Sequence, residues 1–387
     1  MAEALTTQRL DLKVAGGTLA AFRFGGLRVG GPTVVAAHGI TSSSRAWSAV
    51  ARALSGRATL VAPDLRGRGA SSELPGPFGL ATHVADLLAL LDDLSLDRAV
   101  LVGHSLGAYI VARLAVEHPE RVSSVVLIDG GLTIPGLERA NPQAFIEAFL
   151  GPALARLTLS FPDREAYRDW WRAHPAFAAG DVADSDLVAY ADHDLVGEPP
   201  RLRSSVCAQA VRADAAELLE VGAAAHRLTV PANLLCAPRG LLDDPNPVIP
   251  LGLARSWAAR APAQRRATLV EGANHYTITL GARGAAAAAD ALAAAAGTIP
   301  SASRRSKGQI MGISDKLDGL TQKAKDAAAE HHDQILGAVQ KAEAVADQRT
   351  GGKYHEQITK AGGKAQAYVA RLSSKAAEAD APPGSTA

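Results

Sequence analysis

Short apolar runs recur along the first 300 positions of the chain, and stretches with apolar residues at helical spacing separate the first four of them. One such stretch is 82–94, in which valine and leucine recur every three or four residues. Apolar runs that are buried on both faces are typical of the central strands of a parallel sheet. The alternation therefore predicts an α/β fold, in which helices cover both faces of a parallel sheet. The predicted strands are 33–37, 58–62, 98–103, 122–128, 232–237 and 267–270.

The interval 132–228 departs from this alternation, because no convincing strand occurs in it. It contains only helical stretches separated by prolines, and a structureless connection of that length is uncommon. We therefore expect a helical insertion at 132–228 within a core formed by 1–131 and 229–296. The helices expected in the insertion are 142–157, 164–173, 184–195 and 204–219.

The composition of the chain changes near residue 300. A single lysine, Lys13, precedes that position and nine lysines follow it, whereas every Trp and Phe lies before residue 258. We expect a polar linker at 297–310, weakly amphipathic helices at 311–375 and a disordered end at 376–387. The chain thus contains two differently composed parts.

The charges of the whole chain nearly cancel, since 40 Lys and Arg oppose 39 Asp and Glu. This balance gives no reason to expect nucleic acid or an anionic membrane as a partner. The sequence shows no transmembrane stretch and no signal-peptide core, and Cys207 and Cys236 are too few for a disulfide framework. The pair His331-His332 is more typical of a solvated helix face than of a metal site. We therefore expect a cytoplasmic protein without a cofactor or a metal ion.

The most specific motif is GHSLG at 103–107, which follows a predicted strand and precedes a predicted helix. A G-x-S-x-G match alone is also compatible with an ordinary glycine-containing loop. Between a strand and a helix it is typical of a nucleophile elbow, a sharp turn that exposes the serine hydroxyl. Ser105 is therefore the candidate nucleophile of an acyl-transfer reaction.

Acyl transfer also needs a site for the oxyanion and a general base. The segment HGI at 38–40 directly follows a predicted strand, and the backbone N–H groups of Ile40 and Leu106 are the expected oxyanion donors. The chain order nucleophile, acid, histidine places the base late in the core. His275 is the only one of the 11 histidines that lies in the core after the last predicted strand, so it is the expected base.

An orienting carboxylate completes such a site, because it fixes the tautomer of the histidine. Asp243, in the loop after the predicted strand 232–237, is the expected acid, and the adjacent Asp244 is the second choice. Asp129, at the end of the predicted strand 122–128, is a further alternative for the acid. It could instead be a purely structural, hydrogen-bonded aspartate. The sequence leaves this choice open.

Five motifs together resemble the α/β-hydrolase superfamily, and specifically its members with a cap, over residues from about 10 to 296. They are HGI (38–40), PDLRGRGAS (63–71), GHSLGA (103–108), HPERVSSVVLID (118–129) and GANHY (272–276). The resemblance implies an eight-stranded, mostly parallel sheet and a helical cap at 132–228 above Ser105. HGITSSS departs from the family, which often has a bulky residue after HG, and this departure concerns the shape of the acyl pocket.

Haloalkane dehalogenases and epoxide hydrolases resemble this chain but use aspartate where Ser105 stands. We therefore expect a serine hydrolase that cleaves an ester, thioester or lactone of a small apolar substrate, with a carbon–carbon bond hydrolase as the alternative chemistry. A non-catalytic binding protein is the alternative of another class. The residues expected to line the substrate pocket, unless they only pack the cap helices together, are Trp170, Trp171, Tyr190 and His193.

Residues 311–375 resemble short actinobacterial proteins assigned as antitoxins of toxin–antitoxin pairs. The resemblance rests on MGISDKLDGLTQKAKDA (311–327) and ADQRTGGKYHEQITKA (346–361). It implies a toxin-like protein partner for this segment, and the alternative is a solvated tail without a role. Met311 begins the pattern as a start residue would, so we consider a fusion of two reading frames.

Overall fold

The structure is a computed structural model of the chain, and it divides into two compact units, Met1–Ala302 and Ser303–Ala387. It describes residues 6–25, 32–133, 150–151, 153–221 and 223–297. The expected linker after residue 297, the helices expected at 311–375 and the disordered end lie outside the described residues.

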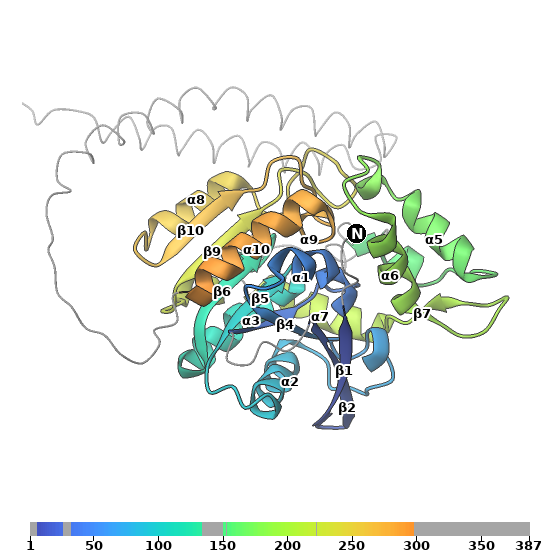
Figure 1. The fold of residues 1–387 in the computed structure, drawn as a ribbon, viewed down its shortest axis with the longest axis horizontal. Coiled ribbons are helices and arrows are strands. Elements are labelled where there is room, and N and C mark those ends of the chain that lie inside the picture. The colour runs from blue at the N-terminus through green and yellow to red at the C-terminus, as the bar shows by residue number, and fades with distance from the viewer. Residues whose placement is uncertain (1–5, 26–31, 134–149, 152, 222, 298–387) are drawn as a thin grey trace, which may run out of the picture. The chain divides into compact units, whose positions relative to one another are not determined.

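Eight strands form one sheet in the order β1-β2-β4-β3-β5-β6-β9-β10 (Figure 1). β1 and β2 pair in antiparallel fashion, as do β2 and β4, and all other neighbours are parallel. The expected eight-stranded, mostly parallel sheet is confirmed. The strands are β1 (Thr7–Val14), β2 (Gly17–Phe24), β3 (Thr33–Ala37), β4 (Thr59–Pro63), β5 (Ala99–His104), β6 (Val122–Ile128), β9 (Ala232–Cys236) and β10 (Arg265–Leu269).

The hairpin of β1 and β2 is absent from the strands predicted by hydrophobic runs. β1 lies at the edge of the sheet and is mostly exposed, with Leu12 as its one fully buried side chain. An edge strand of this kind lacks the continuous apolar run of a central strand. Gly16 adopts a φ of +89° in the turn, a conformation that favours glycine.

Helices cover both faces of the sheet. Successive side chains of each strand point to opposite sides, so one strand contributes to the core on both faces. Leu101 of β5 joins the core cluster beneath α2 (Leu80–Asp93), α3 (Leu106–Glu117) and α8 (Leu251–Ala259). Val100 and Val102 join the cluster on the other face, beneath α1 and α10, which lie side by side in Figure 1. The bounds of these two helices are Ser48–Leu54 and Ala282–Gly297.

Between β6 and β9 the chain forms α5 (Arg164–Arg172), α6 (Asp184–Asp194) and α7 (Ala208–Val221). The expectation of a strand-free insertion is wrong in one detail: β7 (Leu195–Val196) and β8 (Arg203–Ser204) form a small antiparallel hairpin. Two-residue strands are too short to leave a hydrophobic pattern. The expected helix 142–157 lies partly outside the described residues, and its residues 150, 151 and 153–156 are helical.

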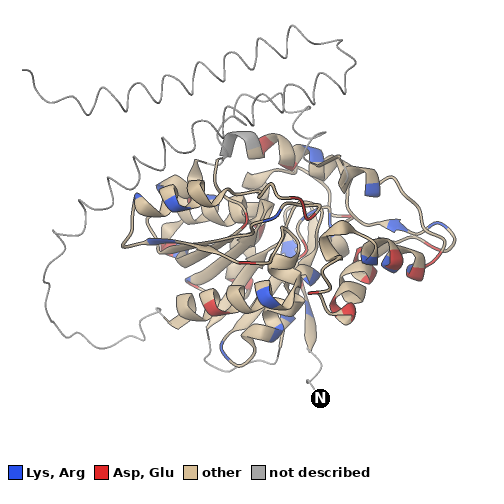
Figure 2. Cartoon of the chain, turned by 90° about the horizontal axis from the view of Figure 1, so that it is seen from above, with Lys and Arg blue, Asp and Glu red and all other residues tan. Residues whose placement is uncertain are grey.

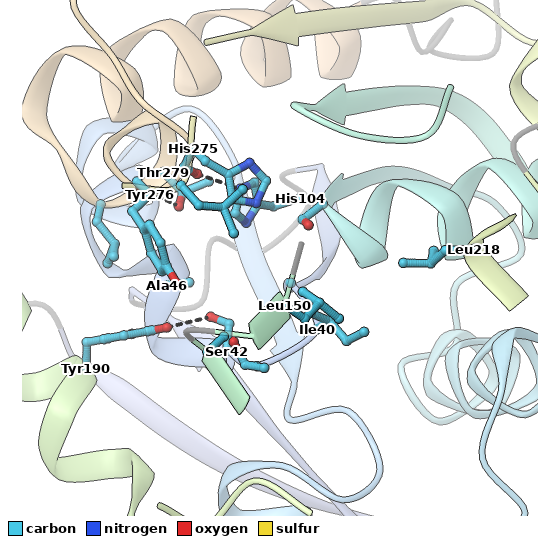
Figure 3. Close-up of a pocket in the computed structure, with 16 residues that line it drawn as sticks. Ile40, Ser42, Ala46, His104, Leu150, Tyr190, Leu218, His275, Tyr276 and Thr279 are labelled. Atoms are coloured by element: carbon cyan, nitrogen blue, oxygen red, sulfur yellow. Dashed lines mark hydrogen bonds between the residues drawn. The ribbon is translucent and has the colours of Figure 1, made fainter. Parts of the chain in front are cut away.

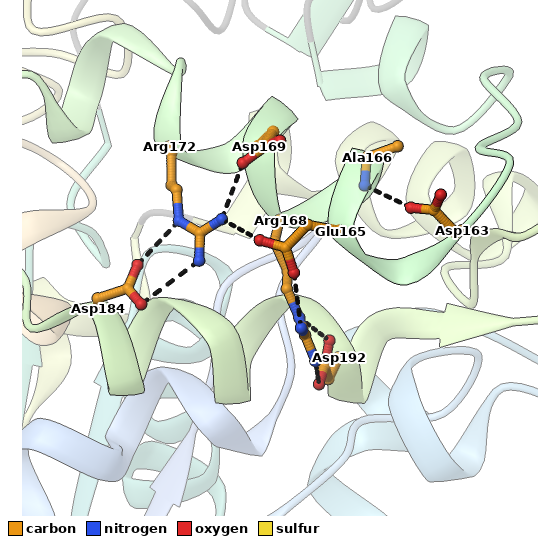
Figure 4. A network of polar contacts seen from close by, with 8 residues as sticks. All are labelled: Asp163, Glu165, Ala166, Arg168, Asp169, Arg172, Asp184 and Asp192. Carbon is orange, nitrogen blue, oxygen red and sulfur yellow. Dashed lines mark hydrogen bonds and ion pairs between the residues drawn. The ribbon is translucent and has the colours of Figure 1, made fainter.

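A network of ion pairs joins α5 to α6 on the surface of the insertion (Figure 4). Arg168 pairs with Asp192 at 2.6 Å, and Arg172 pairs with Asp184 at 2.9 Å. Beneath these pairs, Trp171 is 1% exposed within an aromatic cluster. The insertion therefore has a charged outer face and an aromatic core, to which Ala46 and Leu280 from outside the insertion also belong.

Elsewhere in the described residues, charges of both signs lie mainly on helices and loops, and most of the sheet lacks them (Figure 2). None of the helices in this part of the chain is both long and apolar enough to cross a membrane.

Candidate active site

Ser105 lies between the end of β5 and the start of α3, with φ +53° and ψ −118°. Its neighbours must be small: a Cβ on Gly103 would overlap the carbonyl of Gly107, and a Cβ on Gly107 would overlap the carbonyl of Ala37. The Ser105 N–H donates to the Ile128 carbonyl at 3.0 Å, which fixes the turn against β6. This strand-to-helix turn has the strained backbone of a nucleophile elbow.

His275 lies in the loop between β10 and α9 (Thr277–Leu280), and its ring meets a buried carboxylate. Its Nδ1 lies 2.7 Å from Oδ2 of Asp129, which directly follows β6 and is fully buried. The other carboxylate oxygen accepts the Ala237 N–H at 3.2 Å. Because a carboxylate only accepts, Nδ1 carries the proton and Nε2 is left free to accept another.

Asp243, the acid expected from the sequence, does not meet His275. Arg239, four residues earlier, donates to its carboxylate at 2.7 Å, and Asn274 donates at 3.1 Å. The hydrogen bond from Arg239 also lowers the pKa of Asp243. Asp244, the second choice, accepts the Asn246 N–H instead. The geometry thus favours Asp129, the third alternative. The side chain of Asp243 is instead paired with Arg239 of its own loop.

His38 sets the direction of the loop that follows β3. Its Nε2 accepts the Leu65 N–H at 2.9 Å, so the proton lies on Nδ1, which donates to the Gly39 carbonyl at 2.8 Å. The carbonyl and the N–H of a trans peptide point in opposite directions, so this bond also orients the Ile40 N–H. Burial lowers the pKa of His38 to about 4, which keeps the ring neutral.

Leu106 is the first residue of α3, and the N–H groups of a first helical turn lack an acceptor within the helix. Such N–H groups at a helix N-terminus stabilise negative charge. The expected pair of donors, Ile40 and Leu106, thus flanks Ser105 on two separate elements, the loop after β3 and the start of α3.

A pocket that is partly open to solvent is lined by Ser105 and His275 (Figure 3). Tyr190 is the one residue of the expected pocket set that lines it, and its hydroxyl donates to Ser42 Oγ at 3.2 Å. Several lining residues were not expected from the sequence, although Tyr276 follows His275 within the GANHY motif. The side chains missed are Thr41, Ser42, Leu150, Leu218, Leu241, Tyr276, Thr279 and Leu280.

The other three residues expected in the pocket lie elsewhere. Trp170 and Trp171 pack edge to face with ring centroids 4.9 Å apart, in the core of the insertion. His193 Nε2 donates to Oδ2 of the buried Asp64 at 2.6 Å, outside the pocket lining. Trp170 and Trp171 thus follow the alternative that the sequence left open, the packing of cap helices, whereas His193 contacts Asp64 and Phe22 of the core.

Metal ligands do not gather in the part of the chain that the structure describes: it holds no group of three or more His, Cys, Asp or Glu side chains that could bind an ion.

Comparison with known proteins places this site in a family context. Residues 32–197 match the family described as alpha/beta hydrolase fold, and residues 321–369 match the family described as MT0933-like antitoxin protein. Lipase LipV of Mycobacterium tuberculosis is 32% identical over 169 residues, which cover 43% of this chain and 58% of the lipase. Epoxide hydrolase A of the same species is 37% identical over 126 residues, which cover 31% and 38% of the two chains.

The chain spans about a third to a half of the length of the first curated relatives it matches. Among solved structures, an alpha/beta hydrolase from Novosphingobium aromaticivorans aligns with a TM-score of 0.57 at 21% identity, covering 76% of this chain and 99% of the other. E-2-(acetamidomethylene)succinate hydrolase aligns with a TM-score of 0.56 at 23% identity, covering 71% and 94%. At these identities the likeness concerns the fold alone. Together, the sheet and the family matches show that this chain contains an alpha/beta hydrolase domain and, toward its C-terminus, an MT0933-like antitoxin domain.

Proposed function

We propose that this chain is a serine hydrolase in which Ser105 is the nucleophile, His275 the general base and Asp129 the orienting acid. The observation that carries the proposal is the 2.7 Å hydrogen bond between His275 Nδ1 and the fully buried Asp129, beside the strained turn that presents Ser105. A buried carboxylate on Nδ1 fixes the tautomer whose Nε2 accepts a proton.

The reaction follows from these positions. Ser105 Oγ attacks the carbonyl carbon while its proton passes to His275 Nε2, and the N–H groups of Ile40 and Leu106 stabilise the oxyanion. The carbon–oxygen or carbon–sulfur bond then breaks, and His275 returns the proton to the leaving group. A water molecule, deprotonated by His275, attacks the acyl-enzyme and releases the acid and free Ser105.

The pocket supports a small, uncharged and apolar acyl group. Its described lining consists of aliphatic, aromatic and hydroxyl side chains around two histidines, with no Lys, Arg, Asp or Glu among them. A charged group that lost its hydration here would have no partner among these residues. We therefore propose esters, thioesters or lactones of short apolar acids as substrates, and the likeness to a lipase supports this carbonyl chemistry.

A fluorophosphonate probe tests the nucleophile directly, because it forms a covalent bond with an activated serine. The full chain should be labelled, and Ser105→Ala should not be. Ser42→Ala is a matched control, since Ser42 lines the same pocket and should leave labelling intact. No labelling of the unsubstituted chain, or undiminished labelling of Ser105→Ala, would favour a non-catalytic binding protein. A panel of p-nitrophenyl esters and carbon–carbon bond substrates then separates the two chemistries.

The antitoxin match supports a second function, the binding of a protein by residues 321–369. We propose that 311–375 acts separately from a hydrolase core formed by 1–131 and 229–296 with its cap at 132–228. Deletion of 301–387 tests this division: ester hydrolysis should stay within about twofold of the full chain. Loss of folding or activity would show that the hydrolase depends on this segment.

A further inference from the structure

His104 immediately precedes Ser105, and its mostly buried side chain forms part of the pocket wall. It is 5% exposed, and its Nε2 lies 2.8 Å from the backbone carbonyl oxygen of His275 (Figure 3). Because a carbonyl oxygen only accepts, Nε2 carries the proton and donates it, and Nδ1 is unprotonated. The hydrogen bond thus fixes the tautomer of His104.

His104 lies beside three parts of the site. It is the residue before Ser105 in the elbow, and its ring centroid lies 4.7 Å from that of His275. On the remaining side, Nδ1 faces the loop after β3, where a Cβ on Gly39 would lie 3.3 Å from it. Within the described residues, Nδ1 has no hydrogen-bond partner.

Asn274 anchors the loop that contains His275, because its side-chain oxygen accepts the N–H groups of Tyr276 and Thr277, whereas the backbone of His275 is held less directly. It lies in a loop between β10 and α9, and its N–H reaches the Gly240 carbonyl only at 3.5 Å. At that distance a hydrogen bond is weak. The bond from His104 to the His275 carbonyl is 0.7 Å shorter, so it is the stronger of these two bonds to the His275 backbone.

We propose that His104 is a positioning residue, whose Nε2–H holds the backbone of His275 while Asp129 holds its ring, so that His275 keeps its place in the pocket that Ser105 also lines. This inference rests on the proposed function. The two anchors hold opposite ends of one residue, the backbone carbonyl of His275 and its ring, and together they define its position.

The neutral state of His104 suits this role. Burial holds the pKa of His104 well below its ordinary value, and the neighbouring His275 acts in the same direction. A neutral ring retains the single donor that the carbonyl needs, and it places no positive charge beside the imidazolium that forms on His275 during catalysis.

The test compares His104→Met, which removes the donor at similar volume, with His104→Gln, whose amide can donate at the position of Nε2. Both are measured in the full chain with p-nitrophenyl butyrate, and rates are divided by the concentration of sites titrated with a fluorophosphonate. We expect His104→Met to lower kcat per site about 10-fold or more with KM within about twofold, and His104→Gln to recover most of it. His118→Gln, at a half-exposed surface histidine, is the control and should match the unsubstituted chain.

The outcomes separate the two proposals. An unsubstituted chain that neither turns over ester nor reacts with the probe refutes the proposed function. A reactive chain in which His104→Met keeps its kcat per site, or in which His104→Gln is equally impaired, refutes the role of His104 alone. If His104→Met does not fold, ¹⁵N NMR of the unsubstituted chain, with His104→Gln for assignment, decides: a proton on Nδ1 of His104 would overturn the inference.

Discussion

Replacing Asp129 with asparagine tests the proposed triad most sharply, because both carboxylate oxygens are used. One accepts the His275 Nδ1–H at 2.7 Å and the other accepts the Ala237 N–H at 3.2 Å. Asparagine has only one acceptor oxygen. If this oxygen stays on Ala237, the amide N–H₂ faces Nδ1 and requires the tautomer with the proton on Nε2, which cannot accept the proton of Ser105. The reverse orientation places the amide N–H₂ against the Ala237 N–H.

The expected size of the effect follows from this change of tautomer. An asparagine in place of a triad aspartate lowers kcat by about 10⁴-fold while the fold persists. This corresponds to about 5 kcal/mol of transition-state stabilisation. The activity that remains should come from the oxyanion donors Ile40 and Leu106 and from binding in the pocket.

The assay is kcat with p-nitrophenyl butyrate, corrected for the folded fraction by circular dichroism. Asp243→Asn is the matched control, since Asp243 is the other carboxylate near this edge of the sheet and pairs with Arg239. It should keep kcat within about twofold. The opposite result, an active Asp129→Asn beside an inactive Asp243→Asn, would refute the assignment of the acid and restore the one that the sequence favoured.

Three further predictions concern stability, each measured by urea denaturation. His38 has a folded pKa of about 4 against about 6.5 when unfolded, so the unfolded chain binds more protons between these values and stability falls as the pH falls through that window. The loss between pH 8 and pH 5 should be about 2 kcal/mol smaller in His38→Asn; an unchanged loss would contradict a buried neutral ring. Trp171→Ala should lower the free energy of unfolding by about 3 to 5 kcal/mol, because the side chain is 1% exposed in the insertion core, and a near-neutral effect would argue against that core. Arg172→Ala should leave the midpoint nearly unchanged although three carboxylates contact Arg172, because exposed ion pairs stabilise little; a large shift would be evidence of a cooperative network.

Much of the sheet could be predicted because central strands differ sharply from their surroundings. The runs at 33–37 and 122–128 coincide with β3 and β6, since burial on both faces requires an unbroken apolar stretch. β1 and the short β7–β8 pair escaped prediction, because neither buries enough side chains to leave such a pattern, whereas β2 was missed although it buries residues 19–22 in succession. Periodicity also located α5 and α6 but not the destination of their aromatic residues: Trp171 enters the core of the insertion, whereas Tyr190 reaches the pocket.

The sequence by itself determined the position of the candidate nucleophile, because the elbow is a local structure. Two of its steric demands fall on Gly103 and Gly107, close neighbours of Ser105 in the chain, so the motif can be read from five adjacent residues, although a Cβ on the distant Gly130 would also overlap the Ser105 backbone. Tertiary structure alone decided the partner of His275. Asp129 and Asp243 follow β6 and β9, which are adjacent parallel strands, so both carboxylates reach the same edge of the sheet. They differ in their partners: Asp129 accepts a 2.7 Å hydrogen bond from His275, and Asp243 accepts one of the same length from Arg239. Neither the spacing nor the type of these residues in the sequence encodes which contact forms.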